Sequence, residues 1–166
     1  ITAVFLFVLM SALHAQANYS LSFDGTDDYV SISHNSVLNI SSGTIAAYVK
    51  LDDITDNRYQ RIISKKENWS DAAGYELELN PSQNIITFIA GNDNFARGSF
   101  TPSSDWIQIA VTFNGNVANV YVNGVDVTID GAIDAVTENT VPLYIGNISN
   151  SIGGDATFNG NIYEVA

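Results

Sequence analysis

The chain contains no cysteine among its 166 residues. Disulfides and thiolate metal sites are therefore unavailable, and the fold must be held by core packing, alone or with the help of a metal. His34 is the only histidine beyond residue 17, so zinc sites and Ser–His or Cys–His catalysis lack enough groups. No glycine-rich loop opens a helix, which excludes a phosphate-cradling site of that type.

Positive charge is also scarce, because only 6 Lys and Arg stand against 18 Asp and Glu, for a net charge of −12. Nucleic acids and anionic membranes are bound through clustered cations. We therefore expect neither as a partner. Acidic loops rich in asparagine suit solubility, hydrogen bonding to sugars, or a hard cation such as Ca²⁺.

A long apolar run occurs only at the start of the chain. Residues 1–10, ITAVFLFVLM, precede a stretch in which Ala15 and Ala17 form the A-x-A arrangement of a signal-peptide cleavage site. The run is shorter than the roughly 20 apolar residues of a transmembrane helix. We predict a signal peptide over residues 1–17, a secreted or cell-surface protein without membrane insertion after cleavage, and one domain over residues 18–166.

Sustained helical periodicity is missing after the predicted cleavage site. Short segments instead alternate apolar and polar residues with period two, which is typical of strands. Gly115-Asn116 and Asn123-Gly124 indicate tight hairpin turns, because these residues tolerate a positive φ. The predicted strands cover residues 20–24, 28–33, 44–51, 60–65, 74–80, 84–90, 106–114, 117–123, 125–129, 143–147 and 158–165, with loops at 91–94 and 147–150. The pattern predicts an all-β sandwich or barrel.

Five stretches and their order along the chain carry a resemblance to a known family. They are LSFDGTDDYVSI (21–32), TIAAYVKL (44–51), WIQIAVTFNGNVANVYVNG (106–124), PLYIGN (142–147) and FNGNIYEV (158–165). Together they resemble the laminin-G-like domains of the concanavalin A-like lectin/glucanase group. The resemblance implies an antiparallel two-sheet jelly-roll sandwich. Members usually run on for several residues beyond the position of Ala166, so we expect this domain to be truncated at its C-terminus. The group includes lectins, adhesion modules and glucanases, so the resemblance selects no single function.

The most enzyme-like feature is the pair Glu76 and Glu78, whose side chains point to one face of a predicted strand. Glucanases of the family that the chain resembles use a row of three acidic positions on such a strand. Here the third position is Asn80, which can act neither as an acid nor as a nucleophile. We therefore expect these residues to form a solvated strand face rather than a catalytic site.

Two acidic groups are candidates for a Ca²⁺ site. Asp24, Asp27 and Asp28 surround a tight turn, and such oxygen ligands suit Ca²⁺, which relatives of the resembled family often bind at the sandwich rim. The alternative is that Asp24-Gly25 begins a hairpin and the carboxylates are solvated. The second group, consisting of Asp52, Asp53 and Asp56, has turn-like spacing but does not match an EF-hand loop.

Sugar binding usually needs an exposed aromatic ring with planar polar side chains around it. Trp69 fits best because it interrupts a polar loop, and Phe95 with the adjacent Asn94 is second. Tyr59 and Arg58 lie in another candidate loop. The alternative for each aromatic residue is that it anchors its own loop.

These features favour a non-catalytic carbohydrate-binding module, with a carbohydrate or an extracellular protein as the partner. A protein–protein adhesion domain is the first alternative, and a glycoside hydrolase of the glucanase type is the second. Convergence of Trp69 and Phe95 on a groove would favour sugar, whereas a flat surface would favour adhesion.

Overall fold

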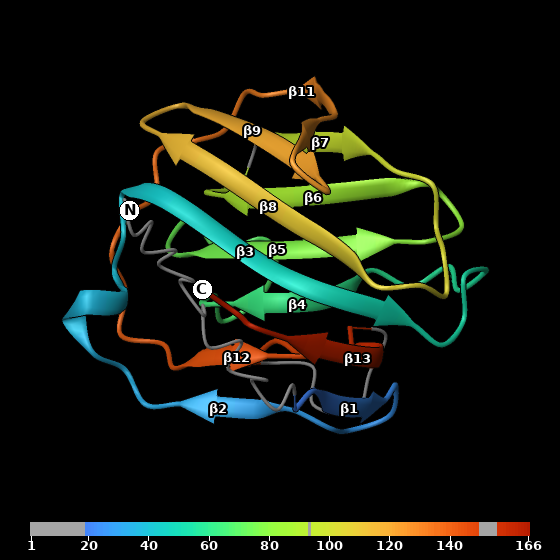
Figure 1. Cartoon of the computed structure of the whole chain (residues 1–166). Helices are drawn as coiled ribbons and strands as arrows, with labels where there is room; N and C mark the ends of the chain where they lie inside the picture. The colour runs from blue at the N-terminus through green and yellow to red at the C-terminus, as the bar shows by residue number, and fades with distance from the viewer. Residues whose placement is uncertain (1–18, 93, 150–155) are drawn as a thin grey trace, which may run out of the picture.

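The computed structural model describes residues 19–92, 94–149 and 156–166, so the predicted signal peptide lies outside the described residues. Two antiparallel sheets are stacked face to face (Figure 1). The front sheet contains, in spatial order, β1 (Leu21–Asp24), β13 (Asn159–Tyr163), β3 (Ser42–Leu51), β8 (Ile107–Asn114), β9 (Val117–Val122) and β10 (Val125–Asp126). The rear sheet contains β11 (Thr128–Asp130), β7 (Phe95–Ser99), β6 (Ile85–Ala90), β5 (Tyr75–Asn80), β4 (Gln60–Ser64), β12 (Leu143–Ile145) and β2 (Val30–Ile32). This arrangement confirms the predicted all-β sandwich.

Helical structure is limited, within these described ranges, to the short 3₁₀ turn η1 (Ser36–Leu38), which the Asn35 side chain caps by accepting from the Val37 amide. The described residues include no helix with the length and apolar character needed to cross a membrane.

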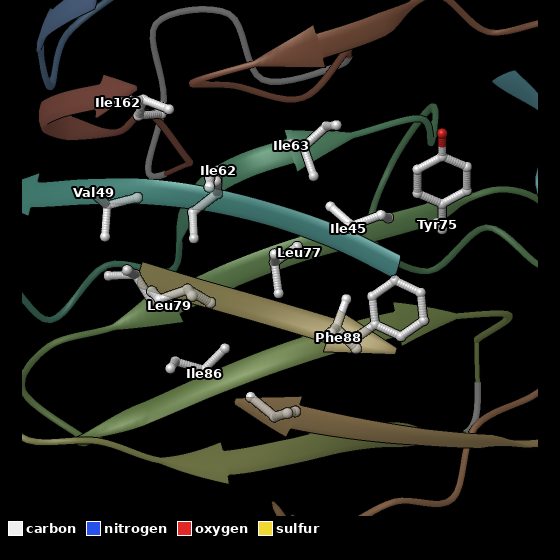
Figure 2. Close-up of a cluster of buried hydrophobic side chains, with 14 of the residues drawn as sticks. Ile45, Val49, Ile62, Ile63, Tyr75, Leu77, Leu79, Ile86, Phe88 and Ile162 are labelled. Atoms are coloured by element: carbon white, nitrogen blue, oxygen red, sulfur yellow. The ribbon is translucent and has the colours of Figure 1, made fainter. Parts of the chain in front are cut away.

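The hydrophobic core lies between the two sheets (Figure 2). Alternate residues of each strand enter it, as period-two patterning requires. In β3 the core side chains are those of Ile45, Ala47, Val49 and Leu51, and in β5 they are those of Tyr75, Leu77 and Leu79. The Phe88 ring packs against the Phe113 ring with 4.9 Å between centroids, which joins the sheets. The predicted inward faces of residues 44–51 and 74–80 are thus confirmed.

Three local predictions were wrong. The turn at Asp24-Gly25 does not close a hairpin, since β1 pairs with β13 and β2 pairs with β12 in the other sheet. Phe95 lies at the start of β7 rather than in a loop. The single strand predicted over residues 125–129 is divided into β10 and β11, which belong to different sheets.

Candidate functional site

The outer face of the rear sheet, which points away from the core, carries two rows of polar and aromatic side chains. The antiparallel register aligns them across β4, β5, β6 and β7. One row is Arg61, Glu78, Thr87 and Arg97, and the next is Ser64, Glu76, Ile89 and Phe95. In β5, β6 and β7 these residues share a face because they alternate with the core residues of the same strand. In β4 a register irregularity between Arg61 and Ile63 places two core residues between Arg61 and Ser64.

A pocket of about 280 Å³ opens on this face. Its lining consists of Tyr59, Arg61, Trp69, Glu78, Thr87, Ile89, Phe95 and Arg97. The structure therefore brings together three aromatic residues singled out in the sequence. Tyr59 comes from the loop before β4, Trp69 from the loop before β5, and Phe95 from the first position of β7.

Trp69 is 55% exposed although it lines the pocket. Its loop is held by hydrogen bonds that do not involve the indole. Asn68 Nδ2 donates to Asp71 Oδ1 at 2.9 Å, and the Ser70 amide donates to Asn68 Oδ1 at 3.0 Å. The buried Lys66 ammonium donates to the Asp71 carbonyl and, at 2.8 Å, to the carbonyl of Gly91. The ring is consequently presented by a loop that is fixed by polar contacts.

The other two rings are also oriented by specific contacts. The Tyr59 hydroxyl donates to Gln83 Oε1 at 3.0 Å, which restrains the ring while 38% of the residue stays exposed. The Arg97 guanidinium lies over the Phe95 ring, with 5.7 Å between its Cζ and the ring centroid. Arg97 is exposed, and it makes no ion pair with any residue in the described part of the chain.

Arg61 lines the floor beneath these rings, and Glu76, which does not line the pocket, pairs with it. Arg61 Nε donates to Glu76 Oε1 at 3.0 Å, Ser64 Oγ donates to Glu76 Oε2 at 2.8 Å, and Arg61 NH1 donates to the Tyr59 carbonyl at 2.6 Å. Glu76 is fully buried. The prediction of a solvated strand face was therefore wrong, because this face lies under loops and neighbouring side chains.

Glu78 is a buried carboxyl that does line the pocket. Its Oε2 lies 3.2 Å from Nη2 of Arg61 and has no hydrogen-bond partner among the described residues. Burial raises the pKa of Glu78 to about 8; the Glu76 carboxylate acts in the same direction, and Arg61 and Arg97 oppose it. Burial therefore favours the neutral, protonated form of Glu78.

Asn80, the third member of the row along β5, supports a loop instead. Its Nδ2 donates to the Asn57 carbonyl at 2.8 Å, and its Oδ1 accepts from Ser82 Oγ and from the Gln83 amide, each at 3.1 Å. This amide therefore positions the turn after β5, including the residue that contacts Tyr59.

The structure does not bring Arg58 and Asn94 into the pocket. Arg58 forms an ion pair with Asp56, with NH2 and Oδ2 2.6 Å apart, and its NH1 donates to the Gly25 carbonyl at 2.7 Å. Asn94 Nδ2 donates to Asp134 Oδ1 at 2.9 Å. Both side chains thus tie loops together at the rim of the sandwich.

The sequence profile of the Concanavalin A-like lectin/glucanases superfamily matches residues 24–166. The chain belongs to this superfamily. Among curated proteins, no sequence matches the chain.

Three solved structures illustrate how this lectin/glucanase fold is shared at low sequence identity. The CBM40 of the Ruminococcus gnavus IT-sialidase has a TM-score of 0.67 at 13% identity, with 88% of each chain covered. Domains LG4-5 of the mouse laminin alpha1 chain have a TM-score of 0.59 at 12% identity, and the match covers 90% of this chain and 42% of the laminin chain. The leech intramolecular trans-sialidase has a TM-score of 0.63 at 15% identity, and the match covers 87% of this chain and 24% of the trans-sialidase chain. These likenesses show the fold.

The acidic turn gathers Asp24, Asp27 and Asp28, which each offer one carboxylate oxygen within 4.8 Å of the others. Hard oxygen ligands of this kind fit Ca²⁺. The Asp24 and Asp28 carboxylates already accept backbone amide hydrogen bonds. The second acidic group forms no such cluster among the described residues, and its Asp56 is paired with Arg58. A Ca²⁺ site at the first group stays a prediction.

Sequence analysis missed the strand residues that line the pocket, chiefly Arg61 and Arg97. One signal was present: these are 2 of only 6 cationic residues, and both stand at outward positions of strands. Register across four strands was needed to place them in one row.

Proposed function

We propose that this domain is a non-catalytic, extracellular carbohydrate-binding module that holds a terminal acidic sugar in the pocket between Tyr59, Trp69 and Phe95. The observation that carries the proposal is the convergence of three aromatic rings around a partly polar floor. Aromatic rings pack against the apolar face of a pyranose ring, while polar groups fix its orientation. At about 280 Å³ the pocket is at the small end of ligand sites, which suits one sugar unit.

The charges of the pocket favour an anionic sugar. Arg61 is compensated by Glu76 at 3.0 Å, and burial, which raises the pKa of Glu78 to about 8, favours the neutral form of that carboxyl. The positive charge of Arg97, which has no ion-pair partner among the described residues, is therefore available to an anionic ligand. A guanidinium binds a carboxylate through paired hydrogen bonds.

The same contacts argue against hydrolysis. A retaining glycosidase needs one carboxylate as a nucleophile and another as an acid. Both oxygens of Glu76 are occupied, by Arg61 and Ser64, and Asn80 stands at the third position of the row. A binding role is consistent with this arrangement.

Structures of the same fold support a sugar ligand. The R. gnavus CBM40 has been solved bound to alpha2,3 and to alpha2,6 sialyllactose. Because mouse laminin domains share the fold, protein adhesion is the alternative function. We favour sugar, because Trp69 and Phe95 meet in a concave pocket rather than on a flat surface.

The direct test uses the variant Trp106→Phe, in which Trp69 is the only tryptophan. We expect sialyllactose to change the Trp69 emission saturably and neutral lactose to have a much weaker effect. Arg97→Gln should lower the affinity for sialyllactose by more than about tenfold, since a hydrogen-bonded charge is lost. Lys50→Gln, which removes one positive charge from the front sheet, should bind normally.

A glycan array distinguishes sugar binding from adhesion. We expect signals from glycans ending in acidic sugars, reduced by Trp69→Ala. An array without signal for any glycan, together with unchanged Trp69 emission, would contradict the proposal and favour a protein partner.

A further inference from the structure

A second aromatic group lies on the opposite side of the molecule, on the outer face of the front sheet. Tyr48 of β3 and Tyr163 of β13 are register partners, and Trp106 immediately precedes β8, which is the next strand beyond β3 (Figure 1). Their neighbours Val49, Ile162 and Ile107 are buried in the core. Alternation along each strand therefore turns all three rings outward.

The three rings form one connected surface. The Tyr48 and Tyr163 centroids lie 6.1 Å apart, and the Trp106 ring meets the Tyr163 ring edge-on at 6.4 Å. Trp106 is 44% exposed. Together with Ser20 and Glu164 they line a hollow of about 610 Å³, which we call the Trp106 platform.

The chemistry of the platform differs from that of the pocket on the rear sheet. The Tyr163 hydroxyl donates to Glu164 Oε1 at 2.5 Å, so an exposed carboxylate stands beside the rings. No cation lines this hollow in the described part of the chain. Such a surface repels anionic ligands and accepts hydrogen bonds from hydroxyl groups. Its volume lies well inside the range for ligand sites and exceeds the need of a single sugar.

We propose that the Trp106 platform is a second binding site, which holds a segment of a neutral oligosaccharide chain. Pyranose faces stack on Trp106 and Tyr48, and sugar hydroxyls donate to the Glu164 carboxylate. This site is separate from the proposed function of the rear-sheet pocket, because the pocket selects an acidic sugar and the platform selects a neutral one. Its existence does not depend on binding in that pocket.

The chain has only two tryptophans, one at each site, so fluorescence can report the sites separately. In Trp69→Phe, Trp106 is the sole reporter. We expect cellohexaose, xylohexaose or mannohexaose to shift its emission saturably, and sialyllactose to leave it unchanged. Tyr48→Ala in this background should weaken the response by at least about tenfold, since a stacked ring is removed.

Tyr121→Ala is the matched control, because Tyr121 also lies on the outer face of the front sheet and does not line the hollow. It should bind normally, and thermal unfolding should show that each variant is folded. Trp106 emission that is unchanged by all neutral hexasaccharides overturns the proposal. A response of Trp69 in Trp106→Phe to the same sugars, without one at Trp106, overturns it while leaving a sugar site in the rear-sheet pocket.

Discussion

Arg61 Nε lies 3.0 Å from Oε1 of Glu76, and this buried ion pair links β4 to β5 under the aromatic pocket. Removing one partner leaves the other as an uncompensated buried charge, which is strongly destabilising. Arg61 also contacts Glu78 and the Tyr59 carbonyl, so it holds both the floor and the wall of the pocket.

We predict that Arg61→Met lowers the free energy of unfolding by about 3 kcal/mol at pH 7. Urea unfolding followed by circular dichroism measures this quantity. The double variant Arg61→Met/Glu76→Gln should recover part of the lost unfolding free energy, because it no longer contains the unpaired Glu76 carboxylate. Equal losses in the single and double variants would show that the ion pair is not the cause.

Glu78 should make stability depend on pH. A free carboxyl ionises near pH 4.5, whereas burial raises the pKa of Glu78 to about 8 in the folded protein. Between these values the folded state keeps a proton that the unfolded state has released, so the contribution of Glu78 to stability falls as pH rises. The free energy of unfolding of wild type should therefore fall relative to that of Glu78→Gln when the pH is raised from 5 to 8.

The corresponding measurement is urea unfolding of both proteins at pH 5, 6.5 and 8. Glu138→Gln, at an exposed position, serves as the control and should follow the wild-type pH dependence. Parallel curves for wild type and Glu78→Gln would contradict a neutral, buried Glu78.

Gly74 should tolerate no side chain, because its φ is +86° and a Cβ atom would lie 2.0 Å from the Lys65 carbonyl oxygen. Gly74→Ala should lower the free energy of unfolding by at least about 3 kcal/mol. Gly115 has φ +59° with nothing within 4 Å of an added Cβ, so Gly115→Ala should cost only about 1 kcal/mol. Similar losses for both variants would mean that backbone strain, rather than the close contact, dominates at Gly74.

Calcium binding at the acidic turn is tested by calorimetry after chelation. We predict a saturable heat with Ca²⁺ and a higher melting temperature. Asp27→Asn is the most informative variant, since Asp24 and Asp28 accept backbone hydrogen bonds. It should weaken Ca²⁺ binding while keeping the melting temperature measured in chelator. A flat titration of wild type would remove this site.

The strands with clear alternation were predictable from the sequence. The inward residues of β3 and β5 follow the period of two with little interruption. The stretch that forms β7, Phe-Ala-Arg-Gly-Ser, contains a glycine and few β-branched or aromatic residues, so local pattern did not predict it. Its place in the sheet depends on pairing with β6 and β11.

The candidate site was only partly predictable. Trp69, Tyr59 and Phe95 were found because an aromatic residue in a polar segment needs an explanation. The burial of Glu76 could not be foreseen, since alternating apolar and acidic residues are typical of a solvated face. Its environment is made by Arg61 and Ser64, whose alignment with β5 requires the three-dimensional register.

The position of β13 between β1 and β3 has a consequence for how the protein folds. A strand formed by residues Asn159–Tyr163 separates two strands that are made more than a hundred residues earlier. Until residues 159–163 have been synthesised, β1 and β3 lack the strand that lies between them, so the front sheet can close only after that point. The high contact order predicts slow folding and a nascent chain that needs protection from aggregation.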